Sequence, residues 1–458
     1  MSNTFSRTIL TSLTTAALSI PGIAQAQKHD PSLQKADANV EKTQKSTPKK
    51  SGLWFGDAVN DLKYTRYIED GNAYKINVWQ AHLVVPVNNW QYELNFMKDS
   101  ESGATQAIVL PSFLDNRFSA NPTALVSGHT GATVQEERSQ IDVSAQYNKE
   151  EALYRVAGYY SAEDDTLAVA LGGNGQWDFN KHNTKLKAGV GVTQEFLKPT
   201  PQGVPGTMRR KGQNTEQDYY LALSQDLSKY NYVQLSLAFQ YTTGFINDQY
   251  RAVSFNGNVA PFSSPGQYTF TPGAALNPVL FPFGYSASIE KKPGKRSVWI
   301  PMLRFVQYIP QTDGSAHFDY RYGSSSWGNH SHMFELDYYQ PFFSDWEFVP
   351  RARYYTQTRA KFYGPTFNVA PGPSTFATVP LRTRYYVSDW RLSGYGTLNF
   401  DAKLSYQVTS FMKVGVIAGF YQCKAGYKLG SKDPIPNPIT SGNGLVTKYF
   451  SIEFNLKL

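Results

Sequence analysis

The chain has 458 residues, of which 15% are aromatic and only 17% are charged, and its formal net charge is +8. Beyond the N-terminal region there is no run of 18 or more apolar residues, which excludes a protein built from membrane-spanning helices. The single cysteine, Cys423, excludes an internal disulfide framework and a cysteine-based metal cluster. The basic residues are scattered and form no patch, so nucleic acid is not an expected partner.

The first residues indicate export from the cytoplasm. Arg7 precedes an apolar and small-residue segment that ends at Ile23, and Ala24-Gln25-Ala26 matches an A-x-A cleavage site. This pattern predicts a cleaved signal peptide over 1–26. Residues 27–52 are rich in Lys, Gln, Ser and Pro and nearly free of apolar residues, which predicts a disordered periplasmic tether. The folded unit is expected to occupy 53–458.

Alternation of apolar and polar residues recurs along this unit and predicts about sixteen β-strands. The expected strands are 61–69, 73–87, 89–98, 137–148, 151–162, 166–180, 183–195, 217–228, 230–242, 297–309, 315–323, 331–342, 345–361, 386–409, 411–430 and 446–458. The stretch 389–409 alternates throughout, and as a strand it would be on the order of 70 Å long. Strands of soluble sheets are much shorter. A membrane barrel places such an apolar face in lipid and the polar face in a wet lumen.

The connections between these strands alternate between short links and longer segments. The long ones are 99–136, 196–216, 243–296, 362–385 and 431–445. Short periplasmic turns and long external loops alternate in this way in outer-membrane barrels. The sequence therefore predicts an all-β fold, a transmembrane antiparallel β-barrel of the outer-membrane type with long extracellular loops. Its location would be the outer membrane of a Gram-negative bacterium, in contact with outer-membrane lipid.

The chain ends in YFSIEFNLKL, an alternating strand with an apolar last residue. This end resembles the C-terminal signal that the outer-membrane insertion machinery reads, although many such signals end in Phe and this one ends in Leu458. The insertion machinery is therefore an expected partner.

Several stretches, in order along the chain, resemble a family of Gram-negative outer-membrane proteins known only as a domain of unknown function. They are DSESGAT (99–105), YYSAEDD (159–165), WDFNKHNTKL (177–186), TGFINDQYRAV (243–253), DYRYGSSSWG (319–328), PRARYYTQTRAKFY (350–363) and VSDWRLSGYG (387–396). The RYYTQ…A.FY and SDWRLS elements are the most specific. Ser324-Ser325-Ser326 departs from the family, in which an acidic residue before the Trp is more typical. The resemblance implies an envelope barrel and brings no established substrate or reaction.

With the apolar register outside, charged and polar side chains of neighbouring strands point into the lumen. The candidate lining residues are Arg351, Arg353, Gln357, Arg359 and Lys361 on 345–361, Asp319 and Arg321 on 315–323, Glu335 and Asp337 on 331–342, and Asp389 and Arg391 on 386–409. These charges either pair with one another or form a partly cationic lining that binds small anionic or polar solutes. Four cations on 345–361 exceed what neutral pairing requires, which favours the lining.

Two smaller motifs have competing interpretations. Asp99, Ser100, Ser102 and Gly103 form an oxygen-rich loop motif, but no histidine can be assigned to a serine, so a turn at a loop entrance is the simpler interpretation. His330 and His332 lie two residues apart, a spacing compatible with a metal. Because Phe334 and Leu336 continue the same face, a position at the lipid–water rim is favoured and no metal site is expected.

The segment 243–296 is a long loop rich in Gly, Pro and aromatic residues. Loops of this length are usually functional. We expect it to fold into the lumen as a constriction or plug, with a floppy external lid as the alternative.

The function expected from these features is a porin-like channel for small hydrophilic solutes, with anionic solutes as one option. The first alternative is a non-transporting barrel that anchors or receives periplasmic or extracellular partners. The second is an outer-membrane hydrolase, for which the sequence offers no Ser–His–acid group. No catalytic residue and no cofactor is expected, and a homo-oligomer is suggested by strand number alone.

Overall fold

The structure is a computed structural model that describes residues 58–70, 74–103, 106–111, 125–129, 134–199, 211–248, 251–256, 267–268, 285–368, 385–434 and 437–457. The expected signal peptide (1–26) and tether (27–52) lie outside these residues. Within them, no helix is long and apolar enough to span a membrane.

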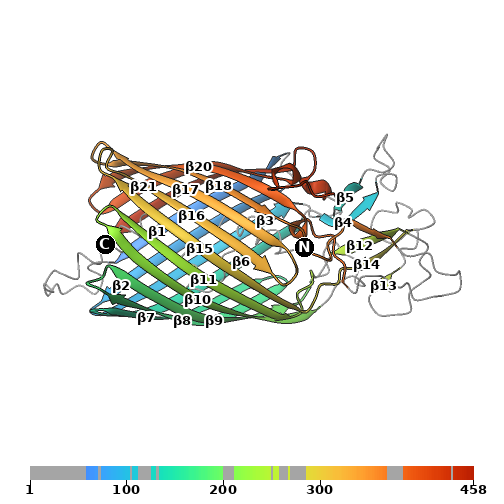
Figure 1. The fold of residues 1–458 in the computed structure, drawn as a ribbon, viewed down its shortest axis with the longest axis horizontal. Helices are drawn as coiled ribbons and strands as arrows, with labels where there is room; N and C mark the ends of the chain where they lie inside the picture. The colour runs from blue at the N-terminus through green and yellow to red at the C-terminus, as the bar shows by residue number, and fades with distance from the viewer. Residues whose placement is uncertain are drawn as a thin grey trace.

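Sixteen antiparallel strands form a closed barrel in chain order (Figure 1). They are β1 (Val59–Glu69), β2 (Tyr74–Val87), β3 (Trp90–Gly103), β6 (Val134–Lys149), β7 (Ala152–Glu163), β8 (Thr166–Phe179), β9 (Thr184–Leu197), β10 (Gly212–Ser228), β11 (Asn231–Gly244), β15 (Lys295–Ile309), β16 (Gly314–Ser325), β17 (His330–Phe342), β18 (Trp346–Gln357), β20 (Tyr395–Thr409), β21 (Met412–Lys424) and β22 (Leu445–Lys457). β1 pairs with both β2 and β22, which leaves the sheet without an edge. The predicted fold class is confirmed.

All sixteen expected strands are present, but several of their ends differ from the prediction. β3 runs to Gly103, five residues beyond its expected end, and β18 stops at Gln357 instead of 361. β20 begins only at Tyr395, because Trp390–Leu392 forms a short 3-10 helix, η4. The alternating pattern continues past the points at which the backbone leaves the sheet.

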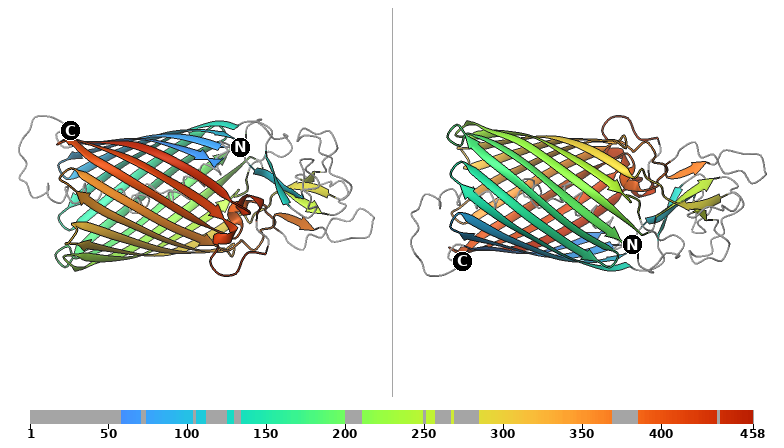
Figure 2. Two further views of the ribbon diagram at one scale, coloured as in Figure 1. Left: turned by 90° about the horizontal axis from the view of Figure 1, so that it is seen from above. Right: turned by 90° about the horizontal axis from the view of Figure 1, so that it is seen from below.

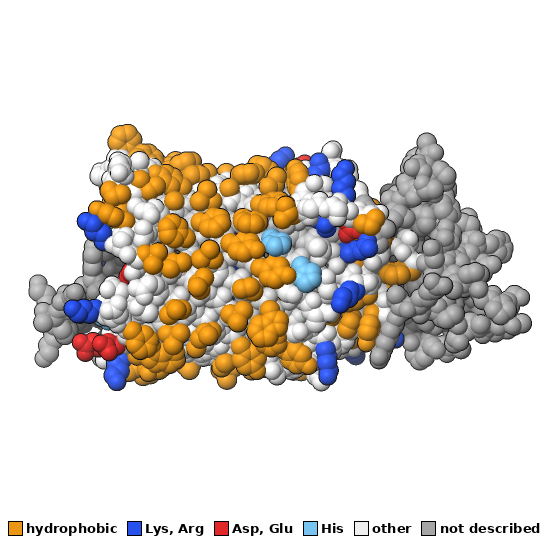
Figure 3. Space-filling model, in the orientation of Figure 1, with side chains coloured by type: hydrophobic (Ala, Val, Ile, Leu, Met, Phe, Trp, Pro, Cys, Tyr) orange, Lys and Arg blue, Asp and Glu red, His pale blue; other side chains and the backbone are white. Residues whose placement is uncertain are grey.

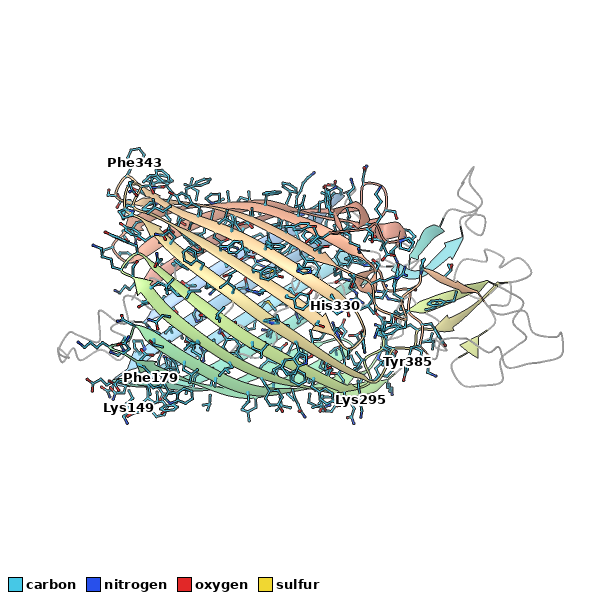
Figure 4. All side chains as sticks on the ribbon, in the orientation of Figure 1. Lys149, Phe179, Lys295, His330, Phe343 and Tyr385 are labelled. Atoms are coloured by element: carbon cyan, nitrogen blue, oxygen red, sulfur yellow. The ribbon has the colours of Figure 1, made fainter. Side chains whose placement is uncertain are left out.

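The two ends of the barrel differ. Tight turns join the hairpins at one end, where Lys149, Phe179 and Phe343 lie, whereas Lys295 and Tyr385 lie at the other end (Figure 4). In these turns Asn88 (φ 55°) and Asp313 (φ 53°) adopt the left-handed region, which Asn and Asp tolerate better than most residues. We call the opposite end, from which the long connections leave, the loop end.

Short strands of the long connections stand beyond the barrel at the loop end (Figures 1 and 2). They are β4 (Gln106–Pro111), β5 (Leu125–His129), β12 (Ala252–Asn256), β13 (Gln267–Tyr268), β14 (Tyr285–Ile289) and β19 (Thr366–Asn368). β19 pairs with β12, so the connections before β15 and before β20 share one small sheet. The described strands of loop 243–296 thus lie outside the lumen, which corrects the expectation of a plug formed by this part of the loop.

Apolar side chains cover the outside of the barrel. On β20, Phe400 and Leu404 are exposed on the outer face, while Asn399 and Lys403 are buried on the inner face. On the face shown in Figure 3, the hydrophobic side chains form a band across the barrel, with Lys and Arg side chains toward both ends. This alternation matches a strand with lipid on one side and a polar lumen on the other.

A charge on the outer band is expected to destabilise the barrel, whereas the same charge on the inner face is not. Leu171 lies in the middle of β8 and is 66% exposed. Replacing it with Arg is expected to cost about 2–4 kcal/mol of the free energy of unfolding in lipid. The matched control is Ala170→Arg on the inner face of the same strand. Urea unfolding of both variants in liposomes measures the difference, and equal stabilities would contradict the assignment of faces.

Candidate solute pathway

Charged side chains of both signs line the inner face of four neighbouring strands, β15 to β18. Across the sheet, Arg304 pairs in register with Asp319, Asp319 with Glu335, and Glu335 with Arg353. The Nε and Nη2 atoms of Arg304 donate to the two carboxylate oxygens of Asp319 at 2.7 and 2.6 Å. Arg353 Nε donates to the Glu335 carboxylate. The buried charges of this row are compensated by charge-assisted hydrogen bonds, which are bidentate between Arg304 and Asp319.

A second row runs parallel to the first, one step nearer to the tight turns. It places Asp337 opposite Arg351 and Arg351 opposite Asp401. Arg351 Nε donates to Asp337 Oδ1 at 2.8 Å. Between the rows and the loop end, Arg321 Nη2 lies 3.9 Å from the Asp319 carboxylate. We call Arg304, Asp319, Arg321, Glu335, Asp337, Arg351 and Arg353 the inner charge ladder.

The ladder corrects the expectation of a cationic column on one strand. β18 contributes only Arg351 and Arg353, and each faces an acid. Arg359 lies beyond the end of the strand and donates to Asp433 at 2.8 Å, while Lys361 is exposed. The chain leaves the sheet here because the residues that follow Gln357 pack into a buried apolar cluster of Trp327, Ala360, Phe362, Tyr363, Val387 and Leu392.

Asp389 and Arg391 also lie off the barrel wall, in a second charged group. Asp389 caps helix η4 and accepts hydrogen bonds from the backbone N–H and the guanidinium of Arg391. Its carboxylate lies 3.5 Å from Arg251 and 3.7 Å from Lys292. Lys292 lies 2.6 Å from Glu290, and Asp248 lies 3.7 Å from both Arg251 and Arg391. We call these six residues the mouth cluster.

The mouth cluster joins segments that are far apart in sequence to the rim of the barrel. Gln357, the last residue of β18, donates from Nε2 to the carbonyls of Arg391 and Ser393, both at 2.7 Å. Asn437, from the connection before β22, donates to the Ser388 carbonyl at 3.1 Å. Three long connections therefore meet at one end of the lumen.

Electrostatics in the mouth cluster hold its central acid in the charged form. Burial alone raises the pKa of Asp389, but the positive charges of Arg251, Arg391 and Lys292 hold that pKa well below its ordinary value. Burial raises the pKa of Glu290 above its ordinary value, with Lys292 opposing the shift. Asp389 is thus held as an anion among the three basic residues of the mouth cluster.

The two smaller motifs have structural roles in the described residues. Asp99, Ser100, Ser102 and Gly103 belong to strand β3 and not to a loop, and Asp99 points inward to accept two hydrogen bonds from Arg138, at 3.1 and 2.6 Å. Its strand extends because every residue of 99–103 pairs with β6. The backbone of Ser102 is described, but its side chain is not.

The two histidines lie near the loop end of β17. His330 (Figure 4) bonds Tyr322 at 3.0 Å, and His332 bonds Tyr320 at 2.9 Å. Among the described residues, no three His, Cys, Asp or Glu side chains are grouped as a metal site. Paired Tyr and His rings on the outside suit the boundary of a lipid layer, where aromatic residues with a polar tip gather.

Sequence reasoning missed several charged partners. Arg304 is the one charged residue in the stretch 298–306 of β15, which is otherwise apolar in both registers, and this was a usable signal for an inward position. Asp248, Arg251, Glu290 and Lys292 lie in irregular segments without periodicity. Only the resemblance of 243–253 to the family drew attention to the first two.

The closed sheet, the apolar outer band and the polar inner face define an outer-membrane-type β-barrel. A family model for proteins of unknown function, DUF3570, matches residues 10–433, and the chain belongs to this family. A comparison with curated proteins found no match.

Solved structures with a similar fold are outer-membrane proteins of low sequence identity. A bacterial polysaccharide outer membrane secretin is 8% identical with a TM-score of 0.42, covering 88% of this chain and 99% of that one. The outer membrane protein OpdK of Pseudomonas aeruginosa is 8% identical with a TM-score of 0.37, covering 88% and 100%. The siderophore receptor PirA of Acinetobacter baumannii is 8% identical with a TM-score of 0.38, covering 82% of this chain and 54% of that one. The chain thus spans about half the length of that receptor.

Proposed function

We propose that this barrel lets small hydrophilic solutes cross the outer membrane of a Gram-negative bacterium through its lumen. The observation that carries the proposal is a closed sixteen-strand wall with polar side chains on its inner face. β17 and β6 are eight strands apart in this ring of sixteen, so they face each other across the lumen. The inner face of β17 presents Glu335 and Asp337 and that of β6 presents Gln140 and Asp142, so a solute in the lumen would meet hydrogen-bonding groups from both sides.

The ladder supports passage of polar solutes more than selection of anions. Each of its arginines lies beside an acid, so the rows present donors and acceptors together and little net charge. The mouth cluster stands at the loop end and would limit the size of the solutes that enter. Export by the signal peptide and insertion by the outer-membrane machinery belong to the same proposal.

The test is ion conductance of the purified protein in a planar bilayer, with a pair of variants on adjacent residues of β7. Ala157 points inward and Val156 points to lipid. Replacing Ala157 with Trp is expected to narrow the lumen and lower the single-channel conductance, because the new ring would occupy part of the solution path. Val156→Trp adds the same ring on the lipid side and should leave the conductance unchanged.

A barrel that receives partners is the competing function, and the meeting of three long connections at one end favours it. If neither the intact protein nor a variant with a loosened mouth cluster conducts ions, this alternative is supported and the channel is overturned. Equal conductance in Ala157→Trp and Val156→Trp would also contradict a path through the lumen.

A further inference from the structure

Asp218 is one of the inward-facing acids that belong neither to the ladder nor to the mouth cluster. Asp218 is on β10, whose neighbouring side chains Tyr219 and Leu221 are exposed on the outer face. In register, Asp218 pairs with Gly191 of β9 and with Gln240 of β11. It therefore points to the lumen in a row with no basic side chain on either adjacent strand.

Asp218 is unlike the acids of the ladder, each of which has an arginine as neighbour. Its side chain is 0% exposed, it forms no ion pair in the described part of the chain, and the neutral Gln240 amide interacts with its carboxylate without good hydrogen-bond geometry. Glu216, the previous inward residue of β10, adds a like charge nearby. A buried carboxylate without a cation is costly, so this position is suited to binding a positive group.

A second buried polar group points to the same place. Thr193 pairs with Glu216 and is therefore the diagonal neighbour of Asp218, and its Oγ1 has no hydrogen-bond partner although the residue is only 4% exposed. Diagonal neighbours in a sheet lie about 7–8 Å apart, close enough for both side chains to reach one small ligand. Gln240 faces Asp218 from the other side.

The wall beside Asp218 is built from small residues. Gly191 pairs with Gly172 of β8, and Gly172 pairs with Ala157 of β7. No side chain larger than a methyl group therefore projects from this row across three strands. In the neighbouring row, which contains Glu216 and Thr242, the cation is Arg296. Its guanidinium carbon lies 5.0 Å from the centre of the Trp327 ring.

We infer that Asp218, Thr193 and Gln240 form a subsite for the ammonium group of a permeating solute. An ammonium group has three N–H donors, and a carboxylate, a hydroxyl and an amide carbonyl supply three acceptors. A resident metal ion fits less well, since the described residues hold no group of three acidic or histidine ligands. This inference rests on the proposed function and names the class of solute, a small amine.

The test measures reversal potentials of single channels in gradients of potassium chloride and of methylammonium chloride. Asp218→Asn is expected to lower the permeability of methylammonium relative to potassium by about two- to fourfold, the effect of one unit charge at about 5–10 Å in water. Thr193→Val should lower the same ratio without changing the net charge of the lumen. The control is Glu137→Gln, an acid on the outer face of β6 whose side chain is 66% exposed, which should leave the ratio unchanged.

The outcomes separate this inference from the function on which it rests. If Asp218→Asn conducts and its permeability ratio of methylammonium to potassium is unchanged, the subsite alone is overturned. Equal losses for potassium and methylammonium also overturn it, because they indicate a general effect of charge or a site for inorganic cations. Absence of any conductance in the intact protein overturns the channel itself.

Discussion

Replacing Asp389 with Asn is expected to loosen the mouth cluster and to increase the conductance of the barrel. The Asp389 carboxylate lies within 3.5 Å of Arg251 and 3.7 Å of Lys292 and bonds Arg391. Without it, Arg251, Lys292 and Arg391 keep Asp248 and Glu290 as the acidic members of the cluster. Removing one partner of a buried ion pair costs about 3–5 kcal/mol, because the remaining charges are left without compensation. The change is therefore expected to weaken the contacts between the three long connections at the loop end and to leave the barrel wall intact.

Single-channel recordings and limited proteolysis of the same preparation measure this effect. The variant should show larger or more frequent conductance steps and faster cleavage in the connections at the loop end, with an unchanged barrel core. Lys98→Gln is the control, since its pair with Glu137 has side chains that are 47% and 66% exposed. Exposed pairs contribute about 0–1 kcal/mol. A variant that conducts and resists protease like the intact protein would show that the cluster does not close the mouth.

The response of the mouth cluster to pH follows from the sign of the pKa shift of Asp389. Its pKa in the folded protein is depressed, so its contribution to stability is present above the ordinary pKa of an aspartate and is lost only as the pH falls through the depressed value. Burial raises the pKa of Glu290 in the same cluster, so the prediction applies to a Glu290→Gln variant. In this variant, conductance should be the same at about pH 5 and pH 7, both above the ordinary aspartate pKa of about 3.9. An opening of the mouth between these two values would contradict the depressed pKa.

The architecture could be predicted from the sequence because lipid on one side and water on the other impose the same alternation on every strand. This constraint is local, so it located all sixteen strands and the inward positions of Arg351, Arg353, Glu335 and Asp337. It does not define where a strand ends. Trp390 and Leu392 continue the apolar register of β20, yet Leu392 is buried among loop residues, and Trp390 packs against residues at the loop ends of β20, β21 and β22.

The mouth cluster could not be predicted because its partners meet only through the tertiary fold. Asp389 contacts Arg251 and Lys292 across more than a hundred and about a hundred residues of chain, respectively, in segments without a regular period. The same applies to Arg359, whose register suggested a lumen position and whose partner Asp433 lies in another connection. Inward position is a local property, whereas pairing of charges is not.

Replacing Glu335 with Gln is expected to destabilise the barrel strongly, and a second change at Arg353 should restore most of the loss. Both side chains are buried and bonded to each other in the middle of the ladder. The single change leaves the Arg353 guanidinium without its carboxylate and is expected to cost about 3–5 kcal/mol of the free energy of unfolding. In the double variant Glu335→Gln/Arg353→Met no charge is left unpaired, and uncharged replacements of buried pairs are often neutral in stability.

Urea unfolding in liposomes of the two single variants and the double variant gives the coupling energy of the pair. We expect this energy to be well above the values of about 0.2–1 kcal/mol found for exposed pairs, and Glu137→Gln at the surface pair with Lys98 supplies that reference in the same protein. A coupling as small as the surface pair would mean that water screens the ladder fully, as in a wide pore. A large coupling would mean that the ladder holds its charges in paired form, and that solutes pass a wall of fixed donors and acceptors instead of free cations.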